Sequence, residues 1–213
     1  GGLSGNLSNS GGHEIYVISE RPPFRLREDR PRIHFCESNL VEFPLFKSPD
    51  HTLPLATRIA EVCTNHQIDL IHAHYAIPHT AAAWIAKELI GQAAPPIITT
   101  LHGTDIIYLG AMAEYRPLLQ HVLEASNLVT CVSENLKKRT EQLFNLDAEI
   151  EVVPNFFEPK PPTRSREDIR ASLDVGDGVL AIHASNLRSI KRIDLMLDAF
   201  KEAVSRCDAN LLI

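Results

Sequence analysis

Apolar and polar residues alternate along this chain in blocks that predict a repeated strand–helix unit. Short apolar runs, typical of strands buried in a parallel sheet, lie at 15–18, 33–36, 68–74, 96–101, 128–132 and 150–153. Apolar residues at helical spacing lie at 52–65, 81–90, 115–126 and 133–144. This regular alternation predicts an α/β, doubly wound domain around a parallel sheet.

A proline-rich segment at 155–165 has no such periodicity and predicts a linker between two domains. Beyond it, helices and strands are expected to alternate again, at 167–173, 179–184, 193–204 and 210–213. We therefore expect a Rossmann-like N-terminal domain over 1–154 and the beginning of a second Rossmann-like domain over 166–213.

Composition narrows the class of protein. The net charge of −6 and the lack of a basic block argue against nucleic acid as the main partner. No apolar run is long enough to span a bilayer, and the first residues do not have the pattern of a signal peptide. The four cysteines form no CxxC pair, which is typical of reduced thiols. We expect a cytoplasmic protein with no membrane partner.

Polar side chains follow two of the predicted strands at the point where each strand ends. His72 and His74 are two residues apart on a strand, so their side chains are expected on the same face of the sheet. Together with His79 they have three possible roles, as metal ligands, as space-filling side chains, or as the lining of a ligand pocket. Tyr75 either packs as an ordinary aromatic or binds a ligand oxygen through its hydroxyl group.

The second strand end carries Thr99, Thr100, His102, Gly103 and Asp105. Glycine allows the backbone to turn sharply and to approach a ligand closely. The imidazole of His102 can hydrogen-bond a transferred group. Asp105 either orients that group or caps the segment that follows. Because strand ends of a parallel sheet meet at one edge, the two clusters predict a ligand site there.

Two further groups of cations are candidates for anion binding. Arg188, Lys191 and Arg192 follow a predicted strand and lie at the start of the next helix, which suits a diphosphate as well as a solvated loop. Arg25 lies near an early strand end, where it can bind an anionic acceptor or pair with a neighbouring carboxylate.

In these segments the chain resembles the retaining GT-B glycosyltransferases, and within them the branch that transfers N-acetylglucosamine to L-malate at the start of bacillithiol synthesis. The matching segments occur in family order at 12–15, 23–26, 71–79, 99–106, 132–133, 153–156 and 185–192. The His-Ala-His-Tyr segment at 72–75 and the Ser-Asn-x-Arg segment at 185–188 are characteristic of this branch.

The resemblance implies two Rossmann-like domains, of which the first binds the acceptor and the second binds most of the sugar nucleotide. It places Tyr75, Thr100, Arg25 and Asn186 at the L-malate acceptor and His102 beside the transferred sugar. Arg188 and Lys191 would hold the diphosphate of UDP-GlcNAc. No metal or other cofactor is then expected, because these cations and a helix N-terminus offset the charge of the leaving group.

The chain also departs from the family pattern at both ends. The family begins with a strand, a glycine-rich loop and a helix, for which residues 1–11 are too short. The family's glutamate-containing donor motif is not found either. These departures predict a partial form that is inactive alone and that associates with itself through exposed apolar faces. The alternatives are a GT-B enzyme with a glycan or lipid acceptor and a non-catalytic binding protein.

Overall fold

The computed structural model describes residues 12–23, 26, 31–39, 51–147, 149–157, 159 and 161–213. The chain divides into two compact units, residues 1–158 and 159–213. Both units are built from parallel strands and helices, so the chain has the predicted α/β fold class. Within the described residues, no helix is long and apolar enough to cross a membrane.

The first described elements of the first unit form a two-stranded parallel sheet. Strand β1 (Ile15–Ser19) pairs with β2 (Ile33–Glu37), and Ile15 lies opposite Ile33. Helix α2 (Thr52–His66) follows and buries one apolar side, which includes Leu55, Ile59 and Val62. This spacing of three or four residues is the amphipathic pattern expected for a helix that covers a sheet.

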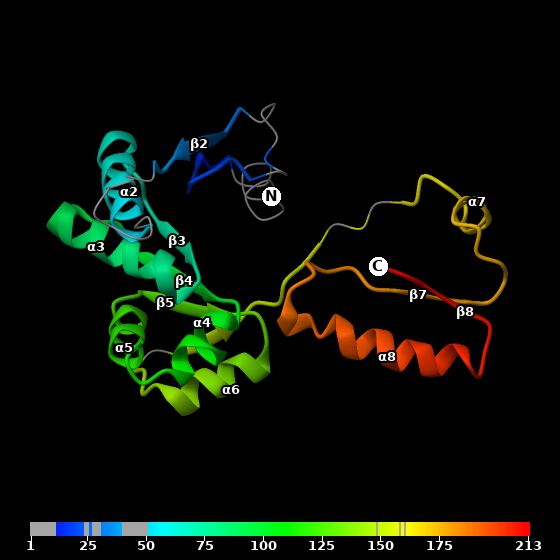
Figure 1. Cartoon of the computed structure of the whole chain (residues 1–213). Helices are drawn as coiled ribbons and strands as arrows, with labels where there is room; N and C mark the ends of the chain where they lie inside the picture. The colour runs from blue at the N-terminus through cyan, green and yellow to red at the C-terminus, as the bar shows by residue number, and fades with distance from the viewer. Residues whose placement is uncertain are drawn as a thin grey trace, which may run out of the picture. The chain divides into compact units, whose positions relative to one another are not determined.

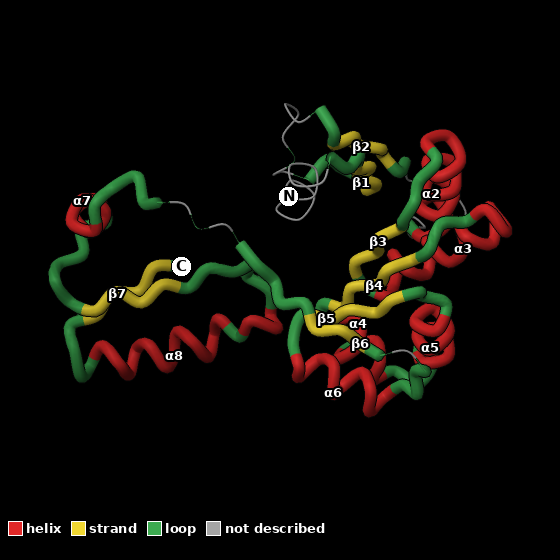
Figure 2. The backbone as a smooth tube through the Cα atoms, turned by 180° about the vertical axis from the view of Figure 1, so that it is seen from behind, coloured by secondary structure: helices red, strands yellow, loops and turns green. Residues whose placement is uncertain are grey.

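The central sheet of the first unit has four parallel strands in the order β3-β4-β5-β6. Their bounds are Ile71–His74, Ile97–Leu101, Leu128–Cys131 and Ile150–Val152. Because each strand pairs with its neighbour in parallel, their carboxyl ends meet at one edge of the sheet. Figure 2 shows β3 to β6 as neighbouring strands in this order.

Helices connect the strands of this sheet in the manner expected for parallel pairing. A kinked turn η1 (Ala76–Thr80), in which Ile77 has an extended backbone, leads into α3 (Ala81–Ile90), and η2 (Gly91–Ala93) closes that connection. After β4 come α4 (Thr104–Ile107), η3 (Leu109–Ala111) and α5 (Arg116–Glu124). Helix α6 (Glu134–Leu143) follows β5, and the hydroxyl of Ser133 caps it by accepting a hydrogen bond from the amide of Leu136.

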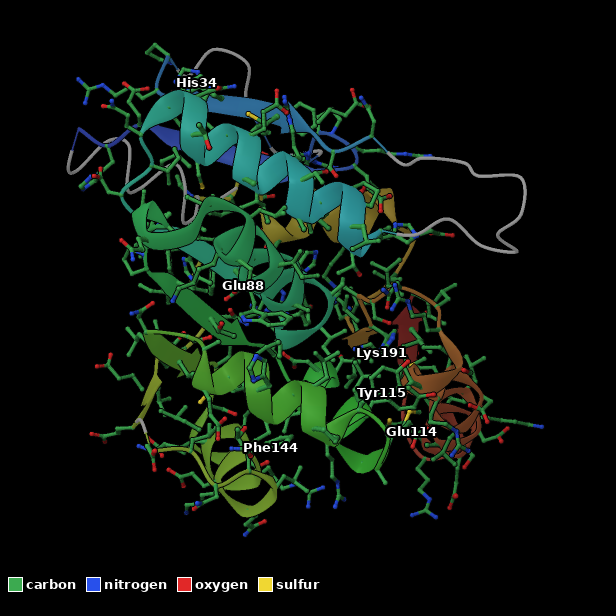
Figure 3. All side chains as sticks on the ribbon, turned by 90° about the vertical axis from the view of Figure 1, so that its left-hand side faces the viewer. His34, Glu88, Glu114, Tyr115, Phe144 and Lys191 are labelled. Atoms are coloured by element: carbon green, nitrogen blue, oxygen red, sulfur yellow. The ribbon has the colours of Figure 1, made fainter. Side chains whose placement is uncertain are left out.

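Two apolar clusters hold this unit together. One contains Leu101, Leu119 and Val129, and Phe144 (labelled in Figure 3) belongs to it as well. The other joins α2 and α3, where Ala82, Ala83 and Ala86 are fully buried, to β3 and β4. Small side chains let the two helices approach closely, since interaxial distance depends on side-chain size. Figure 1 shows α2 and α3 near β3, and α5 and α6 near β5.

The second unit contains one pair of parallel strands, β7 (Val179–Ile182) and β8 (Ala209–Leu212). Helix α7 (Arg166–Ser172) precedes β7, and η4 (Ser189–Lys191) and α8 (Ile193–Val204) connect the two strands. None of its described residues is buried, and Leu195, Leu197 and Val204 of α8 are exposed. This unit therefore has no closed apolar core of its own.

Most elements lie where the apolar pattern predicts them, with ends that differ by a few residues. The strand expected from residue 68 begins only at Ile71, since 67–70 form the turn and bend after α2. The short helices α4 and η3 were not predicted, because segments of four and three residues are too short to show helical periodicity.

Candidate active site

The carboxyl end of β3 places two imidazole rings on one face, as predicted from their spacing. The rings of His72 and His74 stack with their centroids 4.4 Å apart. His72 Nε2 lies 2.7 Å from Oγ1 of Thr100 on the adjacent strand β4. The same oxygen lies 2.7 Å from Oγ1 of Thr130 on β5. A line of hydrogen bonds thus crosses the three neighbouring strands.

The site joins the two strand ends through a contact between imidazole rings. His74 Nδ1 lies 2.9 Å from His102 Nε2, so one of these nitrogens donates and the other accepts. The ring of His102 also lies 4.8 Å from the ring of Tyr75. His79 Nδ1 donates a hydrogen bond of 2.6 Å to the carbonyl oxygen of His74. The sequence-predicted residues His74, Tyr75, His79 and His102 are therefore side by side.

Tyr75 adopts a backbone conformation that a bulky side chain rarely takes. Its φ of 74° lies on the positive side, which favours glycine and costs free energy for other residues. The amide of Tyr75 donates to the carbonyl of Thr100, and its own carbonyl accepts from the amide and the hydroxyl of Thr80. These hydrogen bonds hold a strained backbone that turns an aromatic ring toward His102.

A sharp turn after β4 brings His102 to the same place. Gly103 has a φ of 113°, which only glycine adopts without strain. The buried carboxylate of Asp105 accepts the amide of Gly103 through Oδ1 and the amide of Ala76 through Oδ2, each at 3.0 Å. Of the two alternatives for Asp105, the one in which it caps the next helix is wrong, since Gly103 is at the N-cap of α4 and Asp105 lies in its first turn.

Burial favours the neutral form of three imidazoles of this cluster, those of His72, His74 and His102, by lowering their pKa values. It lowers the pKa of His74 to about 4, and the neighbouring His72, His102 and His79 reinforce the effect. Burial is also the main cause of the lowered pKa of His72. The pKa of His102 is lowered by burial as well, although the charge of Asp105 opposes that shift. Neutral imidazoles can both donate and accept hydrogen bonds at physiological pH.

The histidines do not form a metal site in the part of the chain that the structure describes. No group of three or more histidine, cysteine, aspartate or glutamate side chains is arranged there to hold an ion. His72 instead contacts the hydroxyl of Thr100, His74 contacts the ring of His102, and the two rings stack on each other. These contacts fit both of the other roles open from sequence, space-filling side chains and the lining of a ligand pocket.

In the second unit, the basic segment is exposed. Arg188 and Lys191 (labelled in Figure 3) have no hydrogen-bond or ion-pair partner for their side chains among the described residues, whereas Arg192 pairs with Asp194. The guanidinium of Arg192 also holds the pKa of the Asp194 carboxyl below its usual range. A hollow of about 450 Å³ lies at the start of α8, lined by Leu187, Arg188, Ser189, Arg192, Ile193 and Asp194.

Two further residues predicted from the sequence are Arg25 and Asn186. Arg25 lies outside the described residues. Asn186 lies in the second unit, where its backbone carbonyl accepts a hydrogen bond from the amide of Arg188. Thr130 and Thr80 were not predicted from the sequence. The signal that could have found them is their position, with Thr130 near the end of β5 and Thr80 just before α3.

The match to known families agrees with this geometry. Residues 3–160 match the model of Glycosyltransferase Family 4. The chain belongs to this family. The structure of sucrose-phosphate synthase from Thermosynechococcus elongatus is similar over 98% of this chain and 54% of that one, with a TM-score of 0.69 and 16% identity. Anabaena HepE in complex with UDP-glucose matches 74% of this chain and 42% of that one, with a TM-score of 0.56 and 21% identity. The fold is accordingly of the GT-B type, as the sequence predicted.

Curated relatives share more of the sequence. The N-acetyl-alpha-D-glucosaminyl L-malate synthase of Bacillus anthracis is 36% identical over 204 residues, which cover 95% of this chain and 53% of that protein. The putative teichuronic acid biosynthesis glycosyltransferase TuaC of Bacillus subtilis is 28% identical over 89% of this chain and 54% of its own length. The chain thus spans about half the length of these relatives.

Proposed function

We propose that this chain is the acceptor-binding part, with a portion of the donor site, of a glycosyltransferase that transfers N-acetylglucosamine from UDP-GlcNAc to L-malate with retention at the anomeric carbon. The observation that carries the proposal is the contact of Tyr75 and His102 at the ends of β3 and β4, with rings 4.8 Å apart. The 36% identity to a relative named for this reaction supports the choice of substrates.

The acceptor is proposed to bind against the ring face formed by Tyr75 and His102. The Tyr75 side chain is 37% exposed, so its hydroxyl group can reach a ligand. Thr100 is more deeply placed, and its hydroxyl already contacts His72 and Thr130. A hydroxyl group has one donor and two acceptor positions. The contacts with His72 and Thr130 use two of them, so one position remains for the predicted hydrogen bond between Thr100 and malate.

His102 is proposed to hydrogen-bond the transferred sugar. Its Nε2 is shared with His74, which leaves Nδ1 for a substrate oxygen. The neutral ring has one protonated nitrogen, so the tautomer that His74 selects decides whether Nδ1 donates or accepts. His102 thus acts by hydrogen bonding and orientation, and we assign no residue as a covalent nucleophile.

On the donor side, Arg188 and Lys191 are proposed to bind the diphosphate of UDP. Their unpaired cations and the amides at the start of α8 can offset the charge that develops on the leaving group. No metal ion is then needed for transfer. Asn186 and Arg25 are retained as proposed acceptor contacts.

The test is a transfer assay with the complete gene product, UDP-GlcNAc and L-malate. We expect an α-linked product that forms equally well in excess EDTA, and we expect Tyr75→Phe to raise the KM for malate more than the KM for UDP-GlcNAc. Absence of transfer to malate while UDP-GlcNAc still raises the melting temperature would contradict the proposed acceptor.

A second candidate is a GT-B transferase with a different acceptor. The similarity to TuaC, whose name refers to teichuronic acid biosynthesis, favours a glycan. A panel of glycan acceptors separates the two candidates. If the acceptor is a glycan, Tyr75→Phe should leave transfer within about threefold of the wild type, since the hydroxyl group would not contact a carboxylate.

A further inference from the structure

The most unusual buried group in the first unit is the carboxylate of Asp105. Its exposed fraction is 1%, and it has no ion-pair partner among the described residues. Both oxygens accept backbone amides instead, from Ala76 and from Gly103, each at 3.0 Å. A buried carboxylate is costly unless hydrogen bonds compensate its lost hydration. This carboxylate therefore requires both amides to stay in place.

The two amides belong to the two loops that form the candidate acceptor site. Ala76 directly follows Tyr75, and Gly103 directly follows His102. The backbone is turned sharply at both places, with a φ of 74° at Tyr75 and of 113° at Gly103. Asp105 thus ties together two sharp turns, whose bonded amides precede it by 29 and by two residues in the sequence.

We propose that Asp105 is a positioning residue that fixes the backbone immediately after Tyr75 and immediately after His102, and so sets the spacing of these two side chains in the acceptor site. The inference rests on the proposed function for its catalytic consequence. The two hydrogen bonds from the amides of Ala76 and Gly103 to Asp105, called the clamp below, concern only the described residues of the first unit.

An ordinary helix-capping aspartate does not account for this arrangement. A cap accepts the amides of the helix that it begins, whereas Asp105 accepts an amide before its own helix and another from η1. The long-range bond to Ala76 adds nothing to α4, a helix of four residues. Its only structural effect is to fix one strand-end loop against the other.

The variant that tests the clamp is Asp105→Asn. An asparagine side chain has nearly the same shape but only one acceptor oxygen, so its amide group meets one of the two backbone amides as a second donor. The matched control is Thr140→Val. Thr140 is fully buried on α6, and its hydroxyl donates only to the carbonyl of Leu136, at 2.8 Å. Thr140→Val likewise removes one buried hydrogen bond with little change in volume, but it brings no donor against another donor.

The first measurement is amide hydrogen exchange by NMR on the 213-residue chain. We expect exchange at Ala76 or Gly103 to be at least about tenfold faster in Asp105→Asn than in the wild type and in Thr140→Val, because local opening then lacks one of its hydrogen bonds. Unchanged exchange at both amides would overturn the clamp. If the variant does not fold, a scalar coupling from either amide nitrogen to the carboxyl carbon of Asp105 in the wild type decides the same question, and its absence overturns the clamp.

The second measurement is steady-state transfer by the complete gene product. We expect Asp105→Asn to reduce kcat/KM for malate about 100-fold, since a shift of about 1 Å in a reacting group has this effect. The KM for UDP-GlcNAc and the activity of Thr140→Val should stay within about threefold of the wild type. An equal loss in both variants would reduce Asp105 to a structural residue. A wild type inactive toward malate would contradict the proposed function, while the exchange result would still decide the clamp.

Discussion

The strand-end site of the first unit and the basic segment of the second unit are built in opposite ways. In the first, hydrogen bonds connect nearly every polar group, from Thr130 through Thr100 to His72 and from His74 to His102. In the second, Arg188 and Lys191 are exposed and have no side-chain partner among the described residues. One site is fixed by its own contacts, and these two cations of the other are not.

The difference follows from the packing beneath each site. The carboxyl ends of β3 and β4 lie over two apolar clusters, in which residues such as Ile97 and Leu101 are fully buried. A close-packed interior holds side chains in single positions, so the histidines above it are pre-organised. No described residue of the second unit is buried, and its cations keep their conformational freedom. Ligand binding is then expected to order the second site far more than the first.

The largest expected effect is on the stability of the first unit. Leu101→Ala removes a fully buried side chain beside the site and should lower the free energy of unfolding by about 3 kcal/mol. Leu195→Ala, on the 56% exposed position of α8, should change it by less than about 0.5 kcal/mol. Chemical denaturation of both variants measures the contrast, and equal losses would mean that the units do not differ in packing.

The next largest effect is a loss of activity without a loss of stability. Arg188→Ala in the complete gene product should reduce kcat/KM about 100-fold, because a charged donor to the diphosphate is lost. The melting temperature should not change, since the side chain supports nothing in its own unit. Arg170→Ala is the matched control, because its guanidinium bonds only to backbone carbonyls of Gly176 and Gly178. Equal activity of the Arg188 and Arg170 variants would remove the diphosphate assignment.

A smaller effect on the free energy of unfolding is expected for a variant of the first unit that should nevertheless lose its function. Tyr75→Gly should leave the free energy of unfolding unchanged or raise it by about 1 kcal/mol, since glycine accepts the positive φ without strain. The same variant should lose transfer to malate. Thermal unfolding and the transfer assay test the two halves together. A clear loss of stability would show that the ring contributes packing that outweighs its strained backbone.

The last expected effect is a dependence of stability on pH. His74 has a folded-state pKa of about 4, below the ordinary value of 6.5, so the unfolded chain binds more protons between these values. Stability should therefore be complete above about pH 6.5 and decline as the pH falls toward 4. His74→Gln should show a shallower decline, with melting temperatures at several pH values as the measurement.

The periodicity of the sequence was sufficient to predict the architecture. Strands and helices longer than about four residues bury one regular set of side chains, and that set is visible in the spacing of apolar residues. The position of His72 and His74 on one face followed from the strand period, and the cap at Ser133 followed from its residue type.

The connections inside the site could not be predicted in the same way. No spacing rule indicates that the carboxylate of Asp105 turns inward to an amide 29 residues away. Nor does residue type predict the positive φ of Tyr75, because propensity argues against it. Such features depend on how two loops meet in space, which only the folded chain determines. Strain and buried charge occur together here, as they often do at functional sites.

The central claim, that the ends of β3 and β4 form the acceptor site, is tested most directly by titrating the isotope-labelled complete gene product with L-malate in the presence of UDP. We predict amide shift changes at Tyr75, Ala76, His102 and Gly103 that saturate together, and their loss in Tyr75→Gly. Saturating changes confined to the segment from Arg188 to Arg192, or no change at any of these amides, would contradict the account.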